Sequence, residues 1–253
     1  MIDHAFIQEK GNGKLRQEET LVIEGLKHRG IPYELYTEKR ILRRQLPLTG
    51  TSLVVGDVPC VYGAMKQLGI AIPEANTYPA SLADFMHRKT WRSTAGELRS
   101  EVADGFTRAV FAKPADRQKV FTGTVFESMV DLHPLLRISH RQPIVCAEPV
   151  KWLSEYRVYV CEEAILSIDR YDGDASINVD EARIEEAIHR LAEAGEAYAG
   201  YAIDFGVLSS GDTALVEMND GFSVGAYGIG ADDYTRMVLA RWDELLGTIG
   251  NAS

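Results

Sequence analysis

The 253-residue sequence has few cysteines and no long apolar run, and both absences narrow the classes of protein to consider. Its three cysteines, Cys60, Cys146 and Cys161, form no CxxC pair and have no histidine at zinc-finger spacing. We interpret them as reduced, structural thiols. No stretch reaches the roughly 18 consecutive apolar residues of a membrane span, and the N-terminus lacks a basic start followed by an apolar segment. We therefore expect no membrane partner, no export and a cytoplasmic location.

Two further absences exclude other functions. The formal net charge is -10, and no run of lysine and arginine marks a nucleic-acid-binding surface, so no nucleic-acid partner is expected. A dinucleotide-dependent oxidoreductase would need GxGxxG after the opening strand, but the chain has only Gly-Asn-Gly at 11–13. That class is disfavoured.

Hydrophobic residues make up 45% of the chain, enough to bury a substantial core. In residues 1–75, short apolar runs alternate with helical patterns, which predicts a small α/β lobe with a mainly parallel sheet. Residues 76–107 carry few strand signals and are expected to form a helical connector. Residues 108–250 are interpreted as an α+β block that contains an amphipathic helix closed by Gly200 and a final helix from Asp232.

The clearest motif is a hairpin over residues 201–218 that carries two acids. If its turn centres between Ser210 and Gly211, antiparallel pairing sets Asp204 directly across from Glu217. Opposed like charges destabilise a sheet unless something neutralises them, and a divalent cation would do so. Asn219 projects to the same face as Glu217, and three oxygen-bearing side chains suit Mg²⁺. The alternative is that Asp204 faces solvent on an edge strand; its apolar neighbours favour a half-buried sheet instead.

Several charged residues upstream are candidates for phosphate or ribose contacts. Lys113 ends an apolar run before Pro114, which places it at the end of a strand, although a strand lysine is usually a solvated rim residue. Residues 149–154 form a short connector whose unpaired backbone groups could hold an adenine edge. Glu155 and Arg157 alternate along the next strand and share one face, with a surface ion pair as the alternative interpretation.

In order, the motifs FAKP, KVFTG, EPVKWLSEYRV, AIDFG and VEMNDG resemble those of the ATP-grasp superfamily, in particular its phage-associated clade named for one arginine and two lysines. The resemblance covers roughly residues 85–245, and its specificity lies in the order and spacing of the motifs. It implies an ATP-grasp fold, α/β and α+β in class, in which ATP lies between two lobes. A preceding N-terminal α/β lobe, the pre-ATP-grasp lobe, helps to hold the substrate.

The resemblance also implies a role for each matching residue. Lys113 corresponds to the strand lysine on the α and β phosphates, and Lys119 to the second, catalytic lysine in the loop above them. The stretch from Glu148 through Val150 to Leu153 resembles the adenine-binding hinge. The remaining positions are the ribose-binding Glu155, the phosphoryl-steadying Arg157, the magnesium ligands Asp204, Glu217 and Asn219, and the weaker candidate substrate contacts Arg170 and Ser223.

The activity that the resemblance implies is ATP-dependent ligation of a carboxylate to an amine through an acyl phosphate, with ATP and Mg²⁺ as cofactors. The substrates would be a small-molecule or peptide carboxylate and an amine. The alternatives are an ATP-grasp kinase that phosphorylates a small molecule, or a non-catalytic nucleotide-binding module. The sequence leaves a homodimer open.

Overall fold

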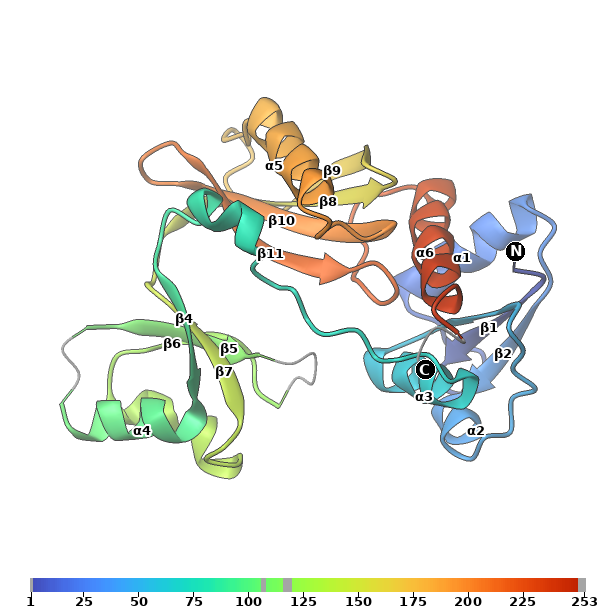
Figure 1. Ribbon diagram of the computed structural model, residues 1–253, viewed down its shortest axis with the longest axis horizontal. Coiled ribbons are helices and arrows are strands. Elements are labelled where there is room, and N and C mark those ends of the chain that lie inside the picture. Colours follow the sequence, from blue (N-terminus) through green and yellow to red (C-terminus); the bar gives the residue numbers. More distant parts are fainter. Residues whose placement is uncertain (1, 106–107, 116–119, 250–253) are drawn as a thin grey trace. The chain divides into compact units, whose positions relative to one another are not determined.

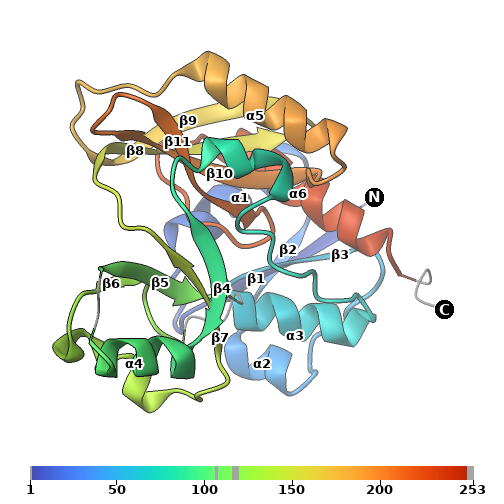
Figure 2. The ribbon, with the colours of Figure 1, turned by 60° about the vertical axis from the view of Figure 1, so that its left-hand side comes forward.

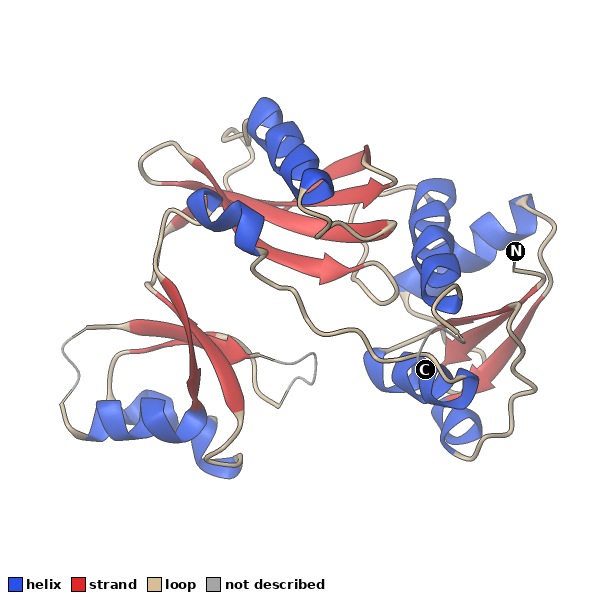
Figure 3. Ribbon diagram, in the orientation of Figure 1, coloured by secondary structure: helices blue, strands red, loops and turns tan. Residues whose placement is uncertain are grey.

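The computed structural model describes residues 2–105, 108–115 and 120–249 (Figure 1). The chain forms two compact units: Met1–Phe85 together with Leu153–Ser253 (unit 1), and Met86–Trp152 (unit 2). Both units contain helices and strands (Figure 3). No helix within these described ranges is long and apolar enough to cross a bilayer.

Unit 1 begins with the parallel α/β lobe that the sequence predicts. Its sheet has the order β2-β1-β3, and β1 pairs in parallel with both neighbours. Helix α3 ends at Leu68 and is capped by Gly69, whose φ of 75° lies in the left-handed region that glycine favours. The elements of the lobe are β1 (His4–Glu9), α1 (Gln17–His28), β2 (Tyr33–Thr37), α2 (Glu38–Leu42), β3 (Ser52–Val55) and α3 (Val58–Leu68).

A second sheet in unit 1 is formed by the C-terminal half of the chain, in the order β11-β10-β8-β9. Helix α5 covers one face of this sheet (Figure 2). It ends at Glu193, before Gly195 in the left-handed region, rather than at Gly200, which is the first residue of β10. The elements are β8 (Trp152–Cys161), β9 (Ala164–Gly173), α5 (Glu181–Glu193), β10 (Gly200–Leu208), β11 (Thr213–Asp220) and α6 (Ala231–Leu246).

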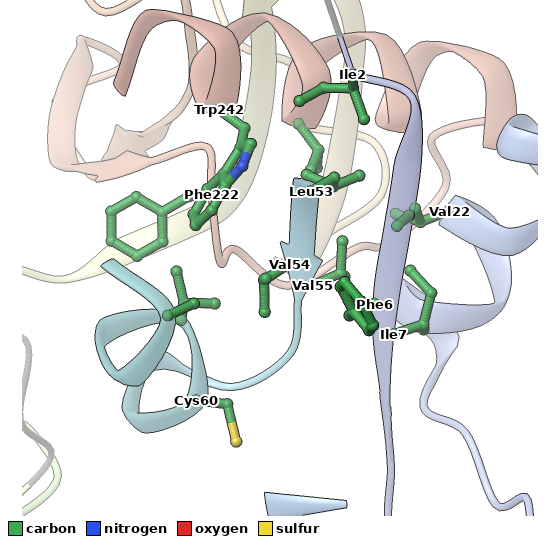
Figure 4. Packing of buried hydrophobic residues seen from close by; sticks show 14 of the residues in the cluster. Ile2, Phe6, Ile7, Val22, Leu53, Val54, Val55, Cys60, Phe222 and Trp242 are labelled. Atoms are coloured by element: carbon green, nitrogen blue, oxygen red, sulfur yellow. The ribbon is translucent and has the colours of Figure 1, made fainter. Parts of the chain in front are cut away.

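One hydrophobic core joins the N-terminal lobe to this C-terminal half. Phe222 and Trp242 pack in the same cluster as Leu53 of β3 (Figure 4). The Trp242 Nε1–H group also donates a hydrogen bond to the Ser52 carbonyl at 2.7 Å. Helix α6 lies against α1, where Gly25 leaves room for a close approach. These contacts make one unit of two segments that are far apart in the sequence.

Unit 2 contains an antiparallel sheet of order β4-β7-β5-β6. Its core includes Leu98, Phe126 and Ile144. Strand β4 lies within residues 76–107, so that segment is not the purely helical connector that the sequence suggested. The elements here are η1 (Ala80–Phe85, at the end of the first part of unit 1), β4 (Thr90–Thr94), α4 (Ala95–Ala103), β5 (Val110–Pro114), β6 (Thr124–Phe126), η2 (Met129–Leu132), η3 (Leu135–Arg137) and β7 (Pro143–Ala147).

All three cysteines are free and buried, which confirms their interpretation as reduced, structural thiols. Burial, followed by the nearby Glu101 and Glu97 carboxylates, raises the pKa of Cys146 to about 12. Its thiol is therefore protonated at neutral pH, which makes it a poor nucleophile.

Candidate functional site

The hairpin of β10 and β11 carries the two acids that the sequence placed opposite each other. Asp204 pairs with Glu217, as predicted. Closer to the turn, Phe205 pairs with Leu215, so the ladder changes register at a bulge. The turn is displaced by half a residue from the predicted centre, and the extra residue Val216 restores the predicted pairing. The prediction of the pair is confirmed, although nothing in the residue pattern indicated the bulge.

Asp204 is buried in a bidentate ion pair with Arg157. The Arg157 Nε–H group donates to Asp204 Oδ1 at 2.8 Å, and Nη2 donates to Oδ2 at 2.6 Å. Only 2% of Asp204 and 8% of Arg157 is exposed, so neither residue is a surface group. Burial works to lower the pKa of Arg157, but the hydrogen bonds and charge of Asp204 outweigh it and raise that pKa. The alternative of a solvent-facing Asp204 is therefore wrong.

Two tyrosines that belong to no sequence motif, Tyr171 and Tyr227, lie beside the Arg157 guanidinium. Its central carbon lies 5.2 Å from the ring centroid of Tyr227 and 5.9 Å from that of Tyr171. The two rings stack on each other with centroids 5.0 Å apart. The Tyr171 hydroxyl donates to Glu155 Oε2 at 2.9 Å. Tyr171 thus contacts both Glu155 and Arg157, as expected for side chains on one face of β8.

Glu217 and Asn219 are half-buried neighbours on β11. The Asn219 Nδ2–H group donates to Glu217 Oε1 at 2.9 Å. Together with Asp204 they carry two carboxylates and one amide, and oxygen ligands of this kind suit a hard cation. Within the described residues, no group of three or more His, Cys, Asp or Glu side chains is placed to hold a metal; the predicted set contains two carboxylates and one amide.

The loop of residues 221–230, which follows β11, is anchored at successive positions. Ser223, a candidate substrate contact, donates through Oγ to the Gly56 carbonyl at the end of β3, at 3.0 Å. The Gly225 carbonyl accepts from Arg157 Nη1 at 3.1 Å. The carbonyls of three loop residues accept side-chain hydrogen bonds: Val224 from Tyr234, Gly225 from Tyr159, and Tyr227 from Gln17. The N–H groups of three loop residues donate to side chains: Ala226 to Glu18, Tyr227 to Tyr159, and Gly228 to Asp169. The loop therefore ties the N-terminal lobe to the face that carries Arg157.

Arg170 is not brought together with Arg157. It pairs with Tyr156 on β8, whereas Arg157 pairs with Asp169, so the two arginines project from opposite faces of the sheet. Arg170 is exposed, and its Nη1–H group donates to the Gly173 carbonyl at 2.7 Å. Its role as a substrate contact remains a prediction without support from this arrangement.

The connector between β7 and β8 is shorter than the sequence suggested. It spans residues 148–151, because β8 already begins at Trp152. The Leu153 carbonyl accepts a hydrogen bond from the Asp174 N–H group at 2.8 Å. The expectation that backbone groups throughout 149–154 are unpaired is therefore wrong at Leu153, and its use as an adenine contact would rest on its other backbone group.

Unit 2 holds the remaining candidates. Lys113 lies on β5 near the end of the strand, as predicted, and pairs with Val145 of β7. Lys119 lies outside the described residues. The Glu148 N–H group donates to the Lys89 carbonyl at 3.0 Å, and Glu148 Oε2 accepts from the Lys89 N–H group at 3.0 Å, so this residue closes the end of the β4–β7 ladder. Val150 lies half-buried in the connector.

Comparison with solved structures shows an ATP-grasp fold. D-cycloserine synthetase DcsG superposes with a TM-score of 0.59 at 12% identity, covering 96% of this chain and 99% of that one. D-alanine–D-alanine ligase from Bacillus anthracis complexed with ATP gives 0.55 at 14% identity, covering 98% and 99%. The macrocyclase MdnC of Microcystis aeruginosa MRC, bound with precursor peptide MdnA, gives 0.53 at 11% identity, covering 94% and 99%.

The family assignment comes from the sequence of the chain itself. No curated protein matches it. Residues 85–237, more than half of the 253 residues, match the ATP-grasp domain of family 2 of the clade named for one arginine and two lysines. The matched range contains the strand lysine Lys113, the buried pair of Arg157 with Asp204, and the carboxylate and amide of β11. The chain therefore belongs to this clade of the ATP-grasp superfamily.

Proposed function

We propose that this protein is an ATP-dependent carboxylate–amine ligase that forms an amide or peptide bond through an acyl phosphate. The observation that carries the proposal is the arrangement on the hairpin. A buried carboxylate, Asp204, lies across from Glu217, with Asn219 on the same strand face and the Arg157 guanidinium at hydrogen-bonding distance. Membership in the ATP-grasp family supports ATP as the nucleotide.

Each residue has a defined task in this proposal. Asp204, Glu217 and Asn219 would hold Mg²⁺, which supplies charge neutralisation at the phosphates when bound. Arg157 would steady the transferring phosphoryl group with N–H donors fixed in one plane by Asp204 and Gly225. Glu155, oriented by the Tyr171 hydroxyl, would accept from the ribose. Lys113 and Lys119 would bind phosphates, and the backbone of residues 148–153 the adenine.

The proposed reaction has two steps. A substrate carboxylate oxygen attacks the γ phosphorus, a new O–P bond forms, and the bond to the β-phosphate bridging oxygen breaks to release ADP. An amine nitrogen then attacks the acyl carbon, loses a proton, and expels inorganic phosphate. The protein needs no nucleophile of its own, because positioning and charge stabilisation supply the acceleration. This agrees with cysteines that are buried and free.

The names of the structural neighbours bear on the class of substrate. One is a D-alanine–D-alanine ligase and another a macrocyclase bound with a precursor peptide. We infer that the carboxylate and the amine belong to an amino acid or a peptide. The cytoplasmic location expected from the sequence belongs to the same proposal.

The proposal is tested by measuring ADP and phosphate release with Mg-ATP against a pool of amino acids and short peptides, with mass spectrometry of the products. Glu217→Ala should lower turnover by about 100-fold or more, because it removes a group that organises the phosphates. Glu185→Ala is the matched control, since Glu185 is exposed on α5. It should retain full activity.

The product distinguishes the ligase from its alternatives. A substrate-dependent product at the mass of an amide condensation supports the ligase. A product that gains only a phosphoryl group identifies a kinase, and ATP binding without turnover across the pool identifies a nucleotide-binding module. Equal activity of Glu217→Ala and Glu185→Ala would contradict the assigned site.

A further inference from the structure

Unit 1 contains two buried arginine–aspartate pairs of nearly identical geometry. Arg157 binds Asp204 with distances of 2.8 and 2.6 Å, and Arg241 binds Asp220 with 2.8 and 2.6 Å. In both pairs Nε and Nη2 donate to the two carboxylate oxygens, and in both the guanidinium lies over a tyrosine ring. Arg241 also donates through Nη1 to Glu244 on its own helix, at 2.7 Å. Because the bidentate geometry is shared, the surroundings of each pair decide what it does.

The surroundings differ in a way that matters for cations. Asp204 lies directly across from a second carboxylate, Glu217, whereas Asp220 lies across from the aromatic Tyr201. The Arg157 site therefore places one guanidinium charge beside two carboxylates of a hairpin. Without the guanidinium, the two carboxylates would present twice the net negative charge to a divalent cation, and the affinity for such a cation rises with the charge of its ligands.

We propose that Arg157 is the internal counter-cation of the Asp204–Glu217 site, which keeps the metal affinity of the free protein low and makes tight metal binding depend on the nucleotide. This rests on the proposed function, because it takes Asp204 and Glu217 as metal ligands. The guanidinium repels a second cation on the same carboxylate. When phosphates are bound, their negative charge pairs with Arg157 and removes that penalty.

The hydrogen bonds of Arg157 fit this dual role. Among the described residues, Asp204 and Gly225 take three of its five N–H donors. The other two can donate to an anionic ligand while Asp204 keeps the plane of the guanidinium fixed. The nucleotide and the metal then bind cooperatively, and by linkage each strengthens the other by the same factor.

The test is a titration of the full-length protein with Mn²⁺ alone, followed by electron paramagnetic resonance of the free ion, and then repeated with ATP. Arg157→Met should tighten nucleotide-free Mn²⁺ binding by about tenfold or more, because one positive charge beside the ligands is lost. Arg241→Met removes a matched pair away from Glu217 and should leave the Mn²⁺ affinity within about twofold of the wild type. The gain in affinity on adding ATP should shrink in Arg157→Met and persist in Arg241→Met.

If Arg157→Met fails to fold, Arg157→Gln carries the same test, because it is neutral and retains an N–H donor for Asp204. Unchanged or weaker nucleotide-free binding in the neutral variant overturns the counter-cation role. A different result would reject the proposed metal site itself. If Mn²⁺ binding in the presence of ATP is retained in both Asp204→Asn and Glu217→Ala, these two residues are not the metal ligands. Loss of that binding in these variants, together with no effect of Arg157, would leave the site and reject only the counter-cation.

Discussion

Asp57 lies two residues beyond the end of β3, where its carboxylate accepts hydrogen bonds from Gln8, Arg16 and Cys60. Gln8 Nε2 donates to it at 3.1 Å, Arg16 Nη2 at 3.2 Å and the Cys60 N–H group at 3.3 Å, the last as the N-cap of α3. Burial works to raise the pKa of Asp57, but hydrogen bonds from the Cys60 thiol, from Gln8 and from the Cys60 N–H group, together with the charge of Arg16, outweigh it and lower that pKa. The charged form is therefore favoured by folding.

This shift fixes the sign of a pH dependence. Because the pKa of Asp57 is lower in the folded state, its contribution to stability is complete above the unfolded value of about 3.9 and is lost as the pH falls through the folded value. Asp57→Asn keeps a capping side chain but cannot ionise. We expect it to be less stable than the wild type at pH 7 and to approach the wild type as the pH falls below the unfolded value of about 3.9, in urea unfolding followed by circular dichroism. A difference in unfolding free energy between the wild type and Asp57→Asn that stays constant with pH would contradict a stabilising role for the charged form of Asp57.

Some residue-scale features could be read from the sequence and others could not. Asp204 and Glu217 belong to one hairpin, so their pairing follows from local arithmetic, and the structure has it. Arg157 reaches Asp204 from another strand, and Tyr227 reaches Arg157 from the loop after β11. No spacing rule connects such positions. The chain itself supplies a cation beside Asp204, the Arg157 guanidinium, and the magnesium ion at the same carboxylate stays a prediction.

At the scale of elements, periodic patterns predict the presence of a helix or strand better than the residues at which it begins and ends. The parallel lobe, the hairpin and α6 are present where apolar periodicity placed them. Helix α5 stops early because Gly195 adopts φ of 67°, a conformation that ends a helix at once. The sequence does not indicate strand β4, because none of its residues is fully buried and apolar and polar residues do not alternate strongly along it.

The pairing of β8 with β9 at the end away from their turn, where Ser154 pairs with Gly173, requires a glycine. Gly173 has φ of 76°, and a Cβ at this position would lie 2.3 Å from the Leu153 carbonyl oxygen and 2.6 Å from the Ser154 Cα. Both the backbone conformation and the space around it therefore require glycine. Gly211, in the β10–β11 turn, has φ of 92°, but an added Cβ would have nothing within 4 Å, so this position isolates the conformational effect.

We expect Gly173→Ala to cost at least about 2 kcal/mol of unfolding free energy, since a backbone clash adds to the left-handed strain. Gly211→Ala should cost only about 1 kcal/mol from the strain alone. Chemical denaturation of the two variants under the same conditions measures the difference. Equal losses of unfolding free energy in the two variants would show that the backbone near Gly173 moves aside and that the clash adds no cost. Because Leu153 belongs to the proposed adenine-binding segment, Gly173→Ala should also weaken ATP binding, whereas Gly211→Ala should not.

At the scale of the whole molecule, sequence order and structural order differ. The pattern of residues 1–75 predicts a lobe of its own, but the core of this lobe is completed by Phe222 and Trp242 from the other end of the chain. Residues 86–152 interrupt that unit and have a separate core. Local patterns contain no information about which distant segments share a core, because such packing is decided by surfaces that meet only after folding.

Because each unit has its own core, we expect a core substitution to destabilise only the unit that contains it. Phe126 is fully buried in unit 2, where its ring packs edge-on against Phe121 with centroids 6.5 Å apart. Phe126→Ala should destabilise unit 2 by about 3–5 kcal/mol. In native-state hydrogen exchange of the full-length protein, amides of β5 and β7 should then exchange faster, while those of α1 and α6 keep their protection. Phe6→Ala should produce the reverse pattern, since Phe6 is buried in the core of unit 1. Uniform acceleration in both variants would mean that the two cores unfold as one cooperative system, and stability would then be a property of the entire chain.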